Sequence, residues 1–165
     1  YSSFYWLDHI SVAYGGMAAA KRRIEEFAVR HPARCQVIRS GAFWSKSLRG
    51  ISLMVRRTLK TTTNERLLKL QTEWKATDLG FQEFFFDFSH RTECAAYDYR
   101  FAGTPFRGTE SEDLIAATLD ILHGDQAPVR NVIGAWRWSE QELPPLSAAD
   151  APVVEAFLSK VPGRV

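Results

Sequence analysis

Cysteine is scarce in this chain of 165 residues, and there is almost no excess of positive over negative charge. The two cysteines, Cys35 and Cys94, are too few for a disulfide framework or, by themselves, for a zinc site. The 21 basic and 19 acidic residues leave a formal net charge of +2, so no strong overall field attracts the molecule to nucleic acid. Any anion site must therefore be a local feature.

Long hydrophobic runs are also missing. The most apolar stretch, 84–86, is interrupted by charged residues within a few positions, whereas a membrane-spanning helix needs about 20 apolar residues. No basic segment followed by an apolar run marks a signal peptide. We therefore expect a cytoplasmic protein with no membrane partner.

Several catalytic motifs are absent as well. The sequence has no glycine-rich phosphate loop, no His-Glu-x-x-His pair and no nucleophile elbow. With so few cysteines, we expect no metal and no other cofactor, and we expect any hydrolysis to depend on histidines.

The remaining composition is that of a folded domain. Hydrophobic residues make up 45% of the chain, charged residues 24% and aromatic residues 13%, and disordered segments are poor in aromatics. The length suits one domain. We expect a single domain over residues 1–165, with candidate lobes at 1–60 and 61–140 and a C-terminal helix at 147–161.

The hydrophobic periodicity predicts helices and strands in irregular alternation. Helices are expected at 17–31, 64–77, 111–123 and 147–161. Strands are expected at 4–14, 35–38, 51–55, 81–88, 92–101 and 129–138. Because the predicted strands often follow one another directly, the pattern favours an α+β fold with antiparallel sheets, flanking helices and two similar lobes around a central cleft.

The predicted faces of two helices can be compared directly with a structure. In the helix at 17–31 we expect an inward face of Ala20, Ile24, Phe27 and Ala28 and an outward face of Lys21, Arg22, Arg23, Glu25 and Glu26. In the helix that begins at Ser111, the inward face is expected to hold Leu114, Ile115, Leu119 and Leu122.

Two histidines are each followed, two residues later, by a hydroxyl side chain. These pairs are His9 with Ser11 and His90 with Thr92, and both fall on predicted strands. Residues two apart on a strand share a face, so two such pairs facing each other would surround a phosphate. One imidazole can take a proton while the other gives one, and the hydroxyls can donate to phosphate oxygens.

Other residues have two interpretations each. Trp136 and Trp138 can stack on a base, or pack against a helix. Glu93 can orient a nearby histidine, or lie on the outer face of a strand. The basic segment at 56–60 and the threonines that follow it can contact phosphate or RNA, or remain solvated.

The motif His9-Ile10-Ser11-Val12-Ala13-Tyr14-Gly15-Gly16, with His90-Arg91-Thr92 further along, resembles the two-histidine phosphoesterases, also called 2H or LigT-like. The resemblance covers residues 5–100. It implies a bilobal fold and metal-independent hydrolysis of a cyclic or 2′-5′-linked phosphodiester in a small nucleotide or oligonucleotide. It further implies that His9 and His90 are the catalytic pair and that Ser11 and Thr92 hold the phosphate. We expect Tyr14, Trp136 and Trp138 to contact the substrate.

The alternative hypothesis is a non-catalytic domain that binds a protein partner, such as a bacterial toxin immunity protein. Small α+β domains rich in aromatics include such proteins, and the loop at 41–44 contributes a glycine and two aromatic residues. The two hypotheses differ in one geometric expectation. In the enzyme, the rings of His9 and His90 should face one cleft, roughly 4–7 Å apart, so that one phosphate contacts both.

Overall fold

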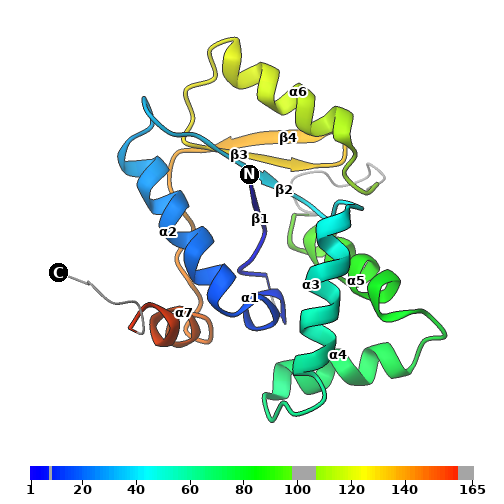
Figure 1. Ribbon diagram of the computed structural model, residues 1–165. Coiled ribbons are helices and arrows are strands. Elements are labelled where there is room, and N and C mark those ends of the chain that lie inside the picture. The colour runs from blue at the N-terminus through cyan, green and yellow to red at the C-terminus, as the bar shows by residue number, and fades with distance from the viewer. Residues whose placement is uncertain (8, 98–106, 160–165) are drawn as a thin grey trace.

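The computed structural model describes residues 1–7, 9–97 and 107–159, with the side chains of His9 and Leu158 outside that description. Within these ranges the chain forms one sheet and a set of helices (Figure 1). The strands are β1 (Ser2–Ser3), β2 (Val37–Ser40), β3 (Val129–Ile133) and β4 (Trp136–Glu140). The helices are α1 (His9–Tyr14), α2 (Gly16–Arg30), α3 (Lys46–Thr58), α4 (Glu65–Lys75), α5 (Phe81–Tyr97), α6 (Ser111–Leu122) and α7 (Ala151–Leu158).

The sheet has the order β1-β2-β3-β4. The pairs β1–β2 and β2–β3 are parallel, and β3–β4 is an antiparallel hairpin. Its turn contains Gly134, whose φ of 55° lies in the left-handed region that glycine adopts readily. The α+β class is thus confirmed, while the sheet itself is mixed rather than antiparallel throughout.

Alternation along the strands gives the sheet two different faces. Ile38 and Val132 point toward α6, where they pack with Ala117. Arg39 and Asn131, which are partners in the parallel register, lie on the other face, where Arg39 pairs with a side chain of α2. Figure 1 shows α6 on one side of the sheet and α2 on the other.

A second core lies among the helices α1, α3, α4 and α5. Its centre is α5, whose buried phenylalanines are spaced as one face of a helix: Phe81, Phe84, Phe85 and Phe88. The strands expected at 81–88 and 92–101 are therefore wrong within the described residues. The unbroken run at 84–86 resembles a buried strand, but the positions at 81 and 88 continue the helical period.

The strand expected at 51–55 is also wrong, because these residues belong to α3. Ser45 caps this helix by accepting a hydrogen bond from the backbone N–H of Leu48 at 3.3 Å. Leu48, Val55 and Leu59 are buried at helical spacing, while charged residues fill the opposite side. The strand expected at 4–14 is likewise replaced, from His9 onward, by α1.

The other elements agree better with the sequence. The strand at 35–38 corresponds to β2, and the helices at 17–31 and 111–123 correspond to α2 and α6. Asn64 caps α4 as expected, accepting from the backbone N–H groups of Arg66 and Leu67. The strand at 129–138 is instead the hairpin of β3 and β4, and the last helix begins at Ala151 rather than at 147.

The predicted faces of α2 and α6 are partly wrong. On α2, Glu25 is completely buried, whereas Ile24 and Phe27 are 53% and 45% exposed. On α6, Ile115 and Leu119 are exposed and Leu122 is 72% exposed, and Ala117 is buried in their place. In α2 the reason is electrostatic, because the carboxylate of Glu25 turns inward to a buried arginine.

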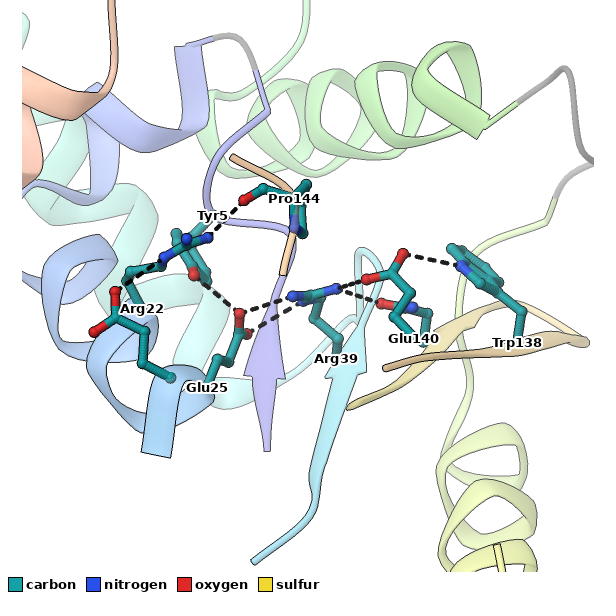
Figure 2. Close-up of polar contacts among 9 residues, drawn as sticks. Tyr5, Arg22, Glu25, Arg39, Trp138, Glu140 and Pro144 are labelled. Carbon is teal, nitrogen blue, oxygen red and sulfur yellow. Dashed lines mark hydrogen bonds and ion pairs between the residues drawn. The ribbon is translucent and has the colours of Figure 1, made fainter. Parts of the chain in front are cut away.

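That arginine, Arg39, is the centre of a buried polar network (Figure 2). Its guanidinium contacts Glu25 Oε2 at 2.8 Å and Glu140 Oε2 at 2.7 Å, and it donates to Asn131 Oδ1 at 2.9 Å. Tyr5 Oη donates to Glu25 Oε2 at 2.9 Å. The network therefore connects α2 with β2, β3, β4 and the segment after β1.

Elements from both halves of the chain share the sheet and the helical core, since β2 pairs with β3 and α3 packs on α5. This arrangement does not confirm two similar lobes at 1–60 and 61–140. Among the described residues, no helix is long and apolar enough to cross a membrane.

We predict that Arg39→Met destabilises the protein by about 3–5 kcal/mol, because it leaves the buried carboxylate of Glu25 without its cation. Urea denaturation measures this loss. Adding Glu25→Gln should recover part of it. Arg23→Met, which removes an exposed ion pair with Glu26, serves as the control and should cost less than about 1 kcal/mol. A loss of that small size for Arg39→Met would contradict the prediction.

Candidate functional site

A pocket of about 430 Å³ lies at the carboxyl ends of β1 and β2. Its walls come from the ends of these strands, the first turn of α3 and one side of α5, with apolar surface from Ile10, Leu48, Ile51 and Phe86. The carboxyl ends of parallel strands are where open α/β sheets bind ligands, and the volume suits a small molecule. The pocket is therefore the candidate functional site.

Glu93, on α5, is the buried carboxyl group of this pocket, with only 3% of the residue exposed. Its Oε2 accepts a hydrogen bond from the backbone N–H of Ala42 at 2.7 Å. Burial raises the pKa of Glu93 to about 8, although that hydrogen bond lowers it. At neutral pH the carboxyl group is mostly protonated, so it can donate a hydrogen bond or a proton.

Two further titratable side chains line the same pocket. Burial and the charge of ionised Glu93 raise the pKa of Tyr14 to about 12, against the lowering effect of a hydrogen bond with Ser3. Lys21 donates from Nζ to Ser3 Oγ at 2.7 Å. Burial lowers the pKa of Lys21, while the charge of Glu25 opposes this change. The pocket thus contains a phenol, an ammonium group and a neutral carboxyl group.

The hydroxyl group of Ser2 is a further polar feature of the wall. Ser2 lines the pocket and is 6% exposed, and its Oγ has no hydrogen-bond partner among the residues that the structure describes. A buried hydroxyl group without a partner is costly.

Of the residues predicted from the sequence, Tyr14 lines this pocket and Ser11 does not. Ser11 donates to Asp150 Oδ1 at 2.5 Å and accepts from Arg66 at 2.9 Å. Burial works against ionisation of Asp150, but hydrogen bonds from Ser11 and Ser147 and the cation of Arg66 hold its pKa below the usual range. Ser11 therefore belongs to a polar cluster that holds α7 against α1 and α4.

His90 and Thr92 both lie on α5, and neither lines the pocket. The ring of His90 packs on that of Phe86, with 6.5 Å between the ring centroids. Cys94 Sγ lies 3.7 Å from His90 Nδ1. Burial lowers the pKa of His90, while the charge of Asp87 opposes this. Thr92 donates its hydroxyl group to the carbonyl oxygen of Phe88 at 2.8 Å.

The geometric premise of the two histidine motifs is wrong. Residues two apart on a helix point about 200° apart, so His90 and Thr92 do not share a face, and the backbone from His9 to Ser11 is helical rather than extended. His9 begins α1, but its side chain lies outside the described part of the molecule. The distance between the two imidazoles is therefore untested, and their catalytic pairing stays a prediction.

Trp136 and Trp138 belong to a hydrophobic cluster between β4, α5 and the start of the chain. The ring of Trp138 lies 6.0 Å from that of Phe4 and 4.8 Å from that of Tyr97. Neither tryptophan lines the pocket. Their packing follows the second of the two sequence interpretations.

Lys21 was predicted on an outer face and not in a site, and Glu93 was predicted to have at most an orienting role. A signal for Glu93 was available in the spacing. Phe86, Ser89 and Glu93 are three and four residues apart, so they form one helical face, and all three line the pocket. A carboxyl group on such a face is a candidate for a shifted pKa.

The described residues contain no group of three His, Cys, Asp or Glu side chains that could hold a metal ion. Among the described residues, Cys35 and Cys94 form no disulfide bond. In comparisons with known proteins, no family model, no curated protein and no solved structure matches the chain. The resemblance to two-histidine phosphoesterases therefore rests on the sequence motifs alone.

We predict that the free energy of unfolding falls between about pH 5 and about pH 8, by up to about 1.4 kcal/mol per pH unit, because of Glu93. The unfolded chain loses this proton near the ordinary pKa of 4.5, whereas the folded chain keeps it to about 8, so folding takes up a proton in this range. Glu93→Gln keeps the acceptor for Ala42 and should remove this slope. Urea denaturation at several pH values compares the two proteins. Equal slopes would contradict the assignment.

We also predict that Gly41→Ala destabilises the protein by about 1–3 kcal/mol, because the pocket is tight at the end of β2. An added Cβ would lie 2.9 Å from Glu93 Oε2 and 3.0 Å from Thr109 Oγ1. Gly50→Ala, in the exposed part of α3 with no atom within 4 Å of the new Cβ, is the control and should stabilise by about 0.5–1 kcal/mol. Thermal unfolding of both variants measures the difference. A neutral Gly41→Ala would show that Glu93 has room to move.

Proposed function

We propose that the protein is an enzyme that acts on a small polar molecule by acid–base catalysis, with Glu93 as the proton donor. The observation that carries this proposal is a buried carboxyl group in a pocket of about 430 Å³, with its pKa raised to about 8. A catalytic acid is most effective when its pKa lies near the working pH. A surface glutamate would be ionised at neutral pH and unable to donate.

The neighbouring groups favour a substrate on which an oxygen gains negative charge during the reaction. Lys21 supplies a positive charge, Tyr14 supplies a phenolic hydroxyl group, and Glu93 supplies the proton. Donors fixed in a partly dry site stabilise such a developing charge strongly. The serine hydroxyl groups of the wall add further donors for polar parts of the substrate.

A cyclic or 2′-5′-linked phosphodiester is a substrate of this class, because its leaving oxygen takes up a proton as the ester bond to phosphorus breaks. Glu93 would give that proton to the leaving oxygen, while the water that adds to phosphorus releases a proton that restores the neutral carboxyl group. This version of the phosphodiesterase hypothesis needs neither histidine. The two-histidine mechanism is a separate proposal for the same substrates, and mutation distinguishes the two.

We predict that Glu93→Gln lowers kcat by about 10²–10⁴-fold, the usual contribution of a general acid. The assay uses a panel of cyclic nucleotides, 2′-5′ oligonucleotides and carbonyl compounds, with EDTA present. Activity should also decline as the pH rises through about 8, because the protonated form of Glu93 is the active one.

The matched control is Glu83→Gln, an exposed change on the same helix that should leave the activity unchanged. Activity that survives Glu93→Gln but disappears in both His9→Ala and His90→Ala would contradict our proposal and support the histidine pair. If no compound of the panel reacts, NMR shifts of pocket resonances report binding directly. Their absence across the panel would reject this pocket for these ligand classes.

A second candidate function, binding of a protein partner without catalysis, is favoured by the surface of α6. Ile115, Leu119 and Leu122 are spaced along one side of this helix, and they are 57%, 45% and 72% exposed. Clustered exposed apolar side chains are typical of contact surfaces. A stable complex with the product of a neighbouring gene, lost on Leu119→Glu and retained on Glu93→Gln, would support this candidate.

A further inference from the structure

The outward side of α3 is the most strongly basic surface among the described helices. Lys46, Arg49 and Arg57 lie on it at helical spacing, and Lys60 continues the same line just after the helix. All four residues are exposed. The helix contains no acidic residue. We call these four residues, together with Leu53 and Met54 between them, the basic face of α3.

These cations differ from most of the arginines elsewhere in the molecule. None of the four forms an ion pair with an acidic residue that the structure describes, and Arg56 beside them lies over the ring of Trp74 instead. The paired arginines are Arg22, Arg23, Arg39, Arg66, Arg91, Arg107, Arg130 and Arg137. The net charge of +2 therefore conceals a local positive surface.

The core of the protein fixes the direction in which this surface points. Leu48, Val55 and Leu59, on the opposite side of α3, are buried in the helical core with α5. The helix cannot turn its apolar side outward without losing that core. The cations are thus presented outward on a rigid support about 20 Å long.

Apolar side chains are exposed among and beside the cations. Leu53 is 49% exposed and Met54 is 41% exposed. Nucleic acid offers phosphates to such cations but no apolar phase for the leucine and methionine. A membrane surface with anionic headgroups offers both phosphates and an apolar phase.

We propose that the basic face of α3 docks the protein onto bilayers that contain anionic phospholipids. The proposal is independent of the pocket and of Glu93. Binding is peripheral and electrostatic: the cations lie at the headgroups, Leu53 and Met54 contact the outer part of the hydrocarbon, and no helix enters the bilayer. The expected absence of a membrane partner followed from the lack of a spanning helix, which does not bear on surface binding.

The test is co-sedimentation of the full chain with vesicles of phosphatidylcholine, with and without phosphatidylglycerol. We expect binding only when phosphatidylglycerol is present, and a steep decrease as salt is added, because exposed charges are screened. Each cation removed from the basic face should weaken partitioning about fivefold, so Arg49→Gln with Arg57→Gln should weaken it about 25-fold.

The matched control is Arg23→Gln with Arg91→Gln, which removes the same charge from exposed ion pairs on α2 and α5. It should bind vesicles far better than the α3 double variant. Leu53→Ser should weaken binding without changing its salt dependence. Equal binding to both kinds of vesicle, no binding to either, or equal losses in the two double variants would each overturn the proposal. Tighter binding to single-stranded RNA than to the anionic vesicles, weakened by Arg49→Gln with Arg57→Gln, would also overturn it.

Discussion

The Arg39 guanidinium joins a helix to two neighbouring strands of the sheet, and the arrangement of the sheet region depends on it. It forms ion pairs with Glu25 on α2 and with Glu140 on β4, and it donates to Asn131 on β3. Two charges taken out of water cost free energy, and only their close geometry repays that cost. The network therefore specifies an arrangement more than it adds stability. It determines which side of α2 faces the sheet, and through α2 it places Lys21 beside the end of β1.

The class of fold and several elements were predictable from local signals. The structure confirms the N-cap at Asn64, the helix at 17–31 and the strand at 35–38, and each of these features depends on residues close by in the sequence. The burial of Glu25 was not predictable, because its partner Arg39 lies in a different element of the chain. From the sequence alone, an arginine on a strand is expected to be exposed to solvent. The same limit applies to Lys21, whose pocket position depends on Ser3 at the end of β1.

The site residues could not be predicted for a different reason, which is that their secondary structure was assigned wrongly. Period-two spacing of a histidine and a hydroxyl residue has meaning only on a strand, and the segments at 9–14 and 81–97 are helices. On α5, the run of phenylalanines obscured the period of 3.6 that brings Phe86, Ser89 and Glu93 together. From the sequence, Glu93 was a candidate only because it follows the His90–Thr92 motif directly. Its chemistry instead comes from burial against the backbone of Ala42, which requires the end of β2 to pass close to α5.

The start of the chain has a consequence for how the molecule can be extended. Tyr1, Ser2 and Ser3 line the pocket, and Tyr1 is 79% exposed while Ser2 is buried in the edge strand. Any polypeptide joined ahead of Tyr1 must leave the molecule beside the mouth of the pocket. An affinity tag fused ahead of Tyr1 would therefore begin at the wall of the pocket. The segment at 61–63, by contrast, lies between α3 and α4, and none of its residues lines the pocket, so it offers an alternative attachment point.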